Sequence, residues 1–85
     1  MDNQKRSFLL YMDAAPVLRQ LTDAQRGRLM MALYDYAGRL SREDVSPEQA
    51  APDSGLDPTV QAVFLFMAAA IRRDTEKWRK QRESY

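Results

Sequence analysis

The feature that most limits the fold is the regular spacing of side chains toward the C-terminus. Positions at alternating intervals of four and three residues run from residue 60 to the end: Val60, Phe64, Met67, Ile71, Asp74, Trp78, Gln81 and Tyr85. This heptad spacing is typical of an α-helix with one apolar stripe, which Asp74 and Gln81 interrupt here. Asp57 as N-cap before Pro58 is a preferred helix start. The pattern predicts a helix over 58–83 that stays amphipathic even where the chain turns basic.

A second helix is predicted over 22–40. Thr22 and Gln25 form a capping box, in which each side chain can bond the backbone of the other, and Asp23 suits the positive end of the helix dipole. Two adjacent apolar stripes follow, the first of Leu29, Leu33, Tyr36 and Leu40 and the second of Met30, Tyr34 and Ala37. A helix covered on so broad a face is expected at the centre of a bundle.

Two glycines fall within this second helix. Gly27 costs about 1 kcal/mol relative to alanine there, so we expect it to permit close packing against another backbone. Gly38 could end the helix as a C-cap, or the helix could continue through Leu40; the pattern leaves both open.

The first segment, 7–21, is apolar but contains Pro16, which disfavours helix at Ala15. We expect Phe8–Met12 to be extended or a separate turn, followed by a helix over 13–21 with Asp13 as N-cap. One helix kinked at Pro16 is the alternative.

Residues 41–56 contain the breakers Pro47, Pro52 and Gly55 and are predicted to be a linker, either without structure or with one short turn at 47–50. A chain of 85 residues makes one small domain. The fold class we predict is all-α: one domain, 1–85, of three helices with a long C-terminal helix.

Composition argues against an enzyme. The chain has no cysteine and no histidine, so it lacks the usual zinc and copper ligands, and it has no glycine-rich phosphate loop. Three carboxylates adjoin apolar positions, but simpler roles suit them: Asp13 as a cap, Asp35 paired with Arg39, and Asp74 bonded to a neighbouring helix or to Lys77. We expect no catalytic residue, metal, cofactor or small-molecule substrate.

Two apolar runs bear on the membrane. The run 60–71 is too short to cross a bilayer, and Phe8–Met12 is too short for a signal peptide. We therefore expect a soluble, cytoplasmic protein that does not contact a membrane.

The C-terminal helix carries a cluster of bases, which are Arg72, Arg73, Lys77, Arg79 and Lys80. On a helical wheel they lie away from the apolar stripe. They could contact nucleic-acid phosphates. The alternative, which we favour, is a solvated face with one-turn pairs from Glu76 to Arg72 and Lys80, at the end of a helix where bases suit the dipole.

The long helix also suggests self-association. It would span about 40 Å, roughly three times the radius of so small a domain, so its last turns extend beyond the core. A second copy or another protein would then cover a contact surface of Ile71, Asp74, Trp78 and Tyr85. The alternative is that residues 8–21 of the same chain lie against this helix.

Four motifs resemble a known family: S-F-L-L-Y (7–11), L-T-D-A-Q-R-G-R-L (21–29), A-L-Y-D-Y-A-G (32–38) and F-x-F-M-x-x-x-I-x-x-D-x-x-K-W (64–78). They look like a small domain of unknown function that recurs in phage and prophage proteins. This domain often stands at the N-terminus of replication-initiation or replisome-organiser-like proteins. The resemblance implies a link to DNA replication, although the linker after Gly38 is longer than the family pattern.

Our leading hypothesis is therefore a non-enzymatic, phage-type helical interaction or oligomerisation module. Its expected partner is itself, as a dimer or higher oligomer, or a replication protein. The alternative is an accessory domain that binds nucleic acid, including DNA, through the basic C-terminal helix.

Overall fold

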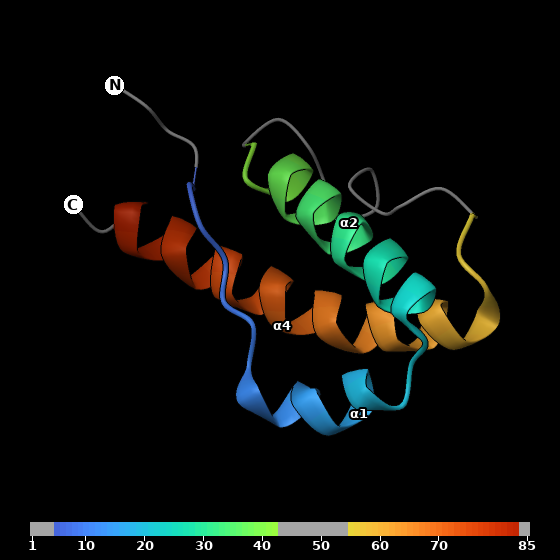
Figure 1. The fold of residues 1–85 in the computed structure, drawn as a ribbon. Coiled ribbons are helices and arrows are strands. Elements are labelled where there is room, and N and C mark those ends of the chain that lie inside the picture. Colours follow the sequence, from blue (N-terminus) through green and yellow to red (C-terminus); the bar gives the residue numbers. More distant parts are fainter. Residues whose placement is uncertain (1–4, 43–54, 84–85) are drawn as a thin grey trace.

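The computed structural model describes residues 5–42 and 55–83, and within these ranges every regular element is a helix (Figure 1). The elements are a 3-10 helix η1 (Met12–Ala14), α1 (Ala15–Arg19), α2 (Asp23–Leu40) and α4 (Pro58–Glu83). The all-α class and the long C-terminal helix are thus confirmed. Residues 43–54, most of the predicted linker, lie outside the described ranges, as does any turn at 47–50.

Both long helices begin where their capping signals predict. The Gln25 backbone N–H donates to the Thr22 hydroxyl at 3.1 Å, and the Thr22 N–H donates to the Gln25 side-chain oxygen at 2.8 Å. The Val60 N–H donates to the Asp57 carboxylate at 2.8 Å, which caps α4. These bonds satisfy backbone donors that have no partner inside a helix.

The helices α2 and α4 lie side by side and run in the same direction (Figure 1). At one end the Gln25 side-chain amide donates to Asp57 at 3.5 Å, and at the other Arg79 donates to the carbonyl of Leu40. An 18-residue helix is about 27 Å long, and the chain must return that distance before α4 begins. This parallel arrangement requires a longer connection than antiparallel neighbours need, which accounts for the long linker.

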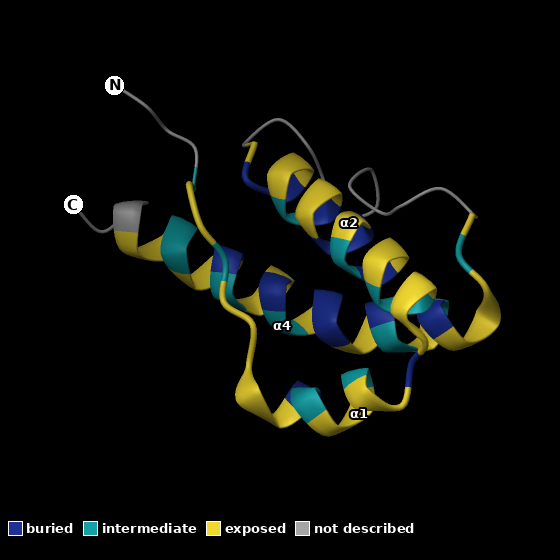
Figure 2. Cartoon of the chain, in the orientation of Figure 1, coloured by how far each residue is buried: buried dark blue, intermediate teal, exposed yellow. Residues whose placement is uncertain are grey.

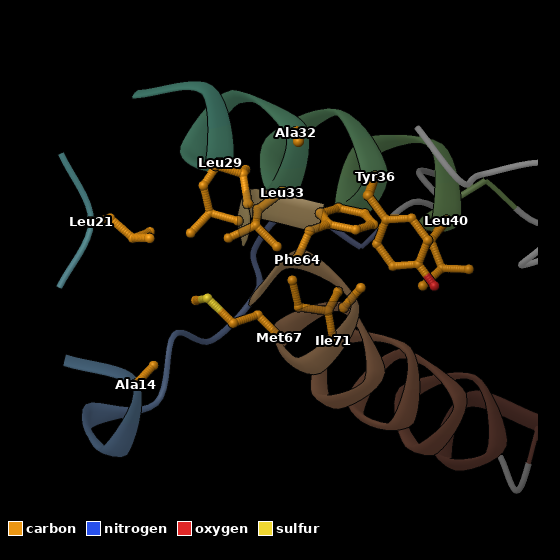
Figure 3. Packing of buried hydrophobic residues seen from close by; sticks show 12 residues of the cluster. Ala14, Leu21, Leu29, Ala32, Leu33, Tyr36, Leu40, Phe64, Met67 and Ile71 are labelled. Carbon is orange, nitrogen blue, oxygen red and sulfur yellow. The ribbon is translucent and has the colours of Figure 1, made fainter. Parts of the chain in front are cut away.

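The core fills the space between α2 and α4 (Figures 2 and 3). Its most deeply buried side chains are Leu29, Leu33 and Leu40 of α2 and Val60, Phe64 and Ile71 of α4. The rings of Tyr36 and Phe64 meet edge to face with centroids 5.6 Å apart. Full burial of each such side chain contributes about 1.5–3 kcal/mol, so this contact is the main source of stability.

The buried stripe of α4 departs from the predicted register after Ile71. Thr75, not Asp74, is the next buried residue, and its hydroxyl donates to the Ile71 carbonyl at 2.8 Å. Asp74 is half-buried and Gln81 is exposed. The reason is helical pitch: a straight helix has 3.6 residues per turn, so a strict heptad pattern drifts about 20° per repeat from the buried side.

The prediction that α2 is central was wrong. Of its second predicted stripe, Met30 and Ala37 are only half-buried and Tyr34 is exposed, whereas Ala32, which neither stripe included, is buried. It is α4 that contacts both other parts of the fold: it packs along α2, and it bonds the first segment through Asp74 and Tyr11. Met67 of α4 belongs to the same buried cluster as Ala14 of η1 and Leu21, which precedes α2 (Figure 3).

The prediction for Gly27 was also wrong. A Cβ added at Gly27 or Gly38 would meet no atom within 4 Å, so neither glycine permits a close backbone approach. Gly38 does not end α2 either. The helix continues to Leu40, and the Ser41 hydroxyl then donates to the Gly38 carbonyl at 2.7 Å.

The first segment forms two short helices rather than one kinked helix. From Lys5 to Tyr11 the chain is non-helical, and it then forms η1 and α1, with Pro16 in the first turn of α1. Asp13 lies within η1 and makes no side-chain cap, which corrects its predicted role. The Arg26 guanidinium closes the next turn, because it donates to the carbonyls of Leu18 (3.0 Å) and Leu21 (2.5 Å).

Candidate interaction surface

The N-terminal segment, residues 5–11, bridges the two long helices. The Phe8 ring packs edge-on against Tyr34 of α2, with centroids 5.2 Å apart. The Tyr11 hydroxyl donates to the Asp74 carboxylate of α4 at 2.5 Å. This bond raises the pKa of the Tyr11 phenol, because the carboxylate accepts a hydrogen bond that only the neutral phenol can donate.

The bridge corrects part of the predicted contact surface. Asp74 bonds the N-terminal segment rather than a neighbouring helix or Lys77, so its Oδ2 already has a partner within the chain. Ile71 is only 2% exposed and packs in the core, so it cannot touch another molecule. Neither residue belongs to an open surface.

Of the other two predicted contact residues, the structure describes only Trp78. Trp78 is half-buried and interacts with other groups of its own chain. Tyr85 lies outside the described residues. Part of the first segment does lie against α4, in agreement with the alternative prediction that residues 8–21 contact this helix.

Of the bases on α4, Arg79 is turned inward. Its Nη2 donates to the carbonyls of Leu40 and, at 2.9 Å, of Arg42, so it binds the C-terminal end of α2. A cation is favourable there because the last carbonyls of a helix lack partners and carry partial negative charge. Arg79 is thus a structural contact between helices, which corrects its placement on the outward basic face.

The remaining bases stay on the outside. Arg72 pairs with Glu76 at 3.4 Å, which confirms that one-turn pair, and both side chains are about half exposed. Arg73, Lys77 and Lys80 are exposed as well, although Lys80 also has an interaction within the chain. A surface pair of this kind contributes little to stability.

An open apolar area lies on part of α4, outside the stripe that the spacing predicted. We call it the outer face of α4 and define it as Ala62, Leu65, Phe66 and Ala69. All four are exposed, Leu65 by 58% and Phe66 by 65%. At about 100° per residue, Phe66 points roughly 160° away from the buried Phe64. The outer face is therefore on the side opposite α2.

The N-terminal segment and η1 extend this apolar area. Leu9, Leu10 and Met12 are exposed, and Met12 is the most open of them at 92%. A hollow of about 270 Å³ separates residues 9–14 from Phe66 and Arg73 and connects the two parts of the area. The Tyr11–Asp74 bond holds the segment beside the hollow.

One sequence signal could have revealed this surface. The run from Val60 to Ile71 is apolar on all sides of the helix, not only at the heptad positions. A helix of this kind is buried all round, yet α2 and the first segment cover only part of α4 here. Apolar residues outside the stripe therefore marked either further core or a surface for a partner.

The chemistry of the described residues is sparse. They contain no cluster of histidine, cysteine or carboxylate side chains that could hold a metal ion. Within 5–42 and 55–83 no helix combines the length and the apolar character needed to cross a bilayer. A second hollow, of about 370 Å³, lies between Lys5–Phe8 and α2 near Thr75. The Thr75 hydroxyl already donates to a backbone carbonyl.

Comparison with known proteins gives one match. The model of a family of unknown function (DUF6291) matches residues 7–84. No curated protein and no solved structure matches the chain. The match confirms a domain of unknown function, as the four motifs predicted, and says nothing of phage or replication.

Proposed function

Since the chain belongs to this family of unknown function, we propose from its geometry that it is a non-enzymatic helical interaction module that associates with itself or with another protein. The observation that carries the proposal is the exposure of Leu65 and Phe66 on the outer face of α4. Leu9 and Leu10 line a hollow together with Phe66, and the exposed Met12 follows them in the chain.

The size of the apolar area supports a protein partner. Single exposed apolar residues are ordinary, whereas the largest contiguous apolar patch on a typical monomer is about 300–600 Å² and is often functional. Taking roughly 200 Å² for a fully exposed large side chain, the five side chains expose about 600 Å² together. This approaches the approximately 800 Å² that each partner contributes to a typical specific interface.

The biological setting is part of the same proposal. The motifs at 7–38 and 64–78 resemble phage and prophage proteins associated with replication initiation. This resemblance supports a phage-type module in the cytoplasm that is linked to DNA replication, with a replication protein as the partner if not a second copy.

Nucleic-acid binding is the second candidate. The observation that favours it is that exposed bases follow the outer face along α4, where Arg72, Arg73 and Lys77 lie past Ala69. Two observations weaken it: Glu76 pairs with Arg72, and Arg79 binds the end of α2 instead of facing outward.

One experiment separates the two candidates. Solution mass is measured by light scattering, and DNA binding is measured at about 50 and 200 mM salt, because a surface that contacts several phosphates loses affinity steeply over that range. Association of the protein without DNA binding supports the interaction module. A monomer whose DNA binding falls sharply with salt overturns it and supports the second candidate.

A further inference from the structure

We infer that the outer face of α4 binds the same face of a second copy, with the two α4 helices antiparallel about a two-fold axis. This inference rests on the proposed function and specifies its partner. It follows from the order of residues along the face, the charges at its end and the position of the N-terminal segment.

The outer face is symmetric about its own midpoint. From Ala62 to Ala69 it reads small, large, large, small, and the midpoint falls between Leu65 and Phe66. A two-fold interface uses the same patch on both copies, so the patch must complement itself. An antiparallel pair centred on this midpoint places Ala62 of one copy against Ala69 of the other.

The large side chains then meet at the axis. The two Phe66 side chains face each other across the axis on one side of the helix pair. The two Leu65 side chains do so on the other side of the pair. Both ends of the face carry alanine, whose small side chain allows the two helices to approach closely. Aromatic pairs of this kind contribute about 0.5–1.5 kcal/mol beyond the area that they bury.

Charges favour the antiparallel arrangement over the parallel one. Arg72 and Arg73 follow the outer face and are exposed. A parallel pair would set them against the same two bases of the other copy, and like charges across an interface are unfavourable. An antiparallel pair separates them and places Arg73 beside the first turn of the other α4, which the exposed acid Asp57 precedes.

The N-terminal segments enlarge the contact. A two-fold axis perpendicular to both helices keeps the segments of the two copies on the same side of the helix pair. Leu9 and Met12 of both copies then flank the Phe66 pair. With about 600 Å² of apolar area per copy, the pair belongs among the smaller specific interfaces, so it should dissociate on dilution.

The absence of cysteine from the sequence permits a direct test by disulfide trapping. Ala62→Cys and Ala69→Cys chains, one of them labelled with ¹⁵N, are mixed under mild oxidation and the products are weighed. The mixed disulfide should predominate over both disulfides of like chains. A Met31→Cys chain is the matched control, because Met31 is 60% exposed but lies on α2.

Two results overturn the arrangement. Predominance of the disulfides between like chains would mean a parallel pair. If the Ala62→Cys and Ala69→Cys chains form no more mixed disulfide than either forms with the Met31→Cys chain, the outer faces do not pair. The solution mass separates this failure from failure of the proposed function. A dimer without the mixed disulfide overturns only the arrangement, whereas a 9.8 kDa monomer with salt-sensitive DNA binding overturns both.

Discussion

The Tyr11 hydroxyl donates a hydrogen bond of 2.5 Å to Asp74, and so joins residues that are 63 positions apart. This bond fixes one end of a short non-helical segment, in which the Phe8 ring also packs against Tyr34. Leu9 and Leu10, between these contacts, are exposed beside the outer face of α4. The bond therefore positions part of the proposed interaction surface, although it lies at the edge of the fold.

Removing that bond should loosen the segment without unfolding the domain. Tyr11→Phe should lower the free energy of unfolding only slightly, because the pair is largely solvated. Amide hydrogen exchange at residues 8–12 should nevertheless become faster. Tyr34→Phe is the matched control, since it keeps the ring that packs on Phe8. Unchanged exchange in Tyr11→Phe would show that the bond does not hold the segment.

The same bond predicts a dependence on alkaline pH. The native pKa of Tyr11 is raised above its ordinary value of about 10, so its contribution to stability is complete below that pH. The contribution is lost as the pH rises through the native pKa. In Asp74→Asn the pKa of Tyr11 should fall back toward the ordinary value. NMR titration of the Tyr11 ring measures this, and an unchanged midpoint in Asp74→Asn would refute the assigned cause.

Arg79 should stabilise the end of α2. Arg79→Met keeps much of the apolar stem but removes the donors to Leu40 and Arg42, and should lower the free energy of unfolding by about 1–2 kcal/mol. Urea unfolding measures the loss. Arg28→Met, at an exposed position of α2, is the control and should change stability by less than about 0.5 kcal/mol. Equal losses of stability in the two variants would contradict the stabilising contact of Arg79 with the C-terminal end of α2.

Replacing either of two glycines in α2 by alanine should stabilise the domain. Gly27→Ala and Gly38→Ala should each raise the free energy of unfolding by about 0.5–1 kcal/mol, because both sites are helical and an added Cβ meets nothing within 4 Å. Thermal unfolding measures the change. Destabilisation by either variant would mean that the glycine permits a close contact after all.

Local signals in the sequence were sufficient for the starts of the long helices. Thr22 with Gln25, and Asp57 with the amide three residues later, form hydrogen bonds within one turn, so they depend little on the rest of the fold. The heptad spacing also predicted which side of α4 faces the core, as far as Ile71. Beyond Ile71 the strict heptad failed, because helical pitch moved the buried position to Thr75.

The arrangement of the helices, and with it the candidate surface, did not follow from local signals. Nothing in the spacing of α2 and α4 shows that they run in parallel. A helix segment that is apolar on every side could be covered all round, so the spacing that placed Phe64 in the core did not show that Phe66 stays exposed. Which parts of α4 are covered also depends on residues far away in the sequence, such as Tyr11, which bonds Asp74.

The central claim is that the outer face of α4 is a protein-binding surface that a second copy occupies. Sedimentation equilibrium over a dilution series tests it in the wild type, in Phe66→Glu and in the matched control Met31→Glu, which places the same charge at a similarly exposed residue of α2. The solution mass of the wild type and of Met31→Glu should rise with concentration toward twice the 9.8 kDa chain mass, while that of Phe66→Glu remains at the chain mass. A wild type that stays monomeric throughout, or a Phe66→Glu variant that associates as the wild type does, would contradict the claim.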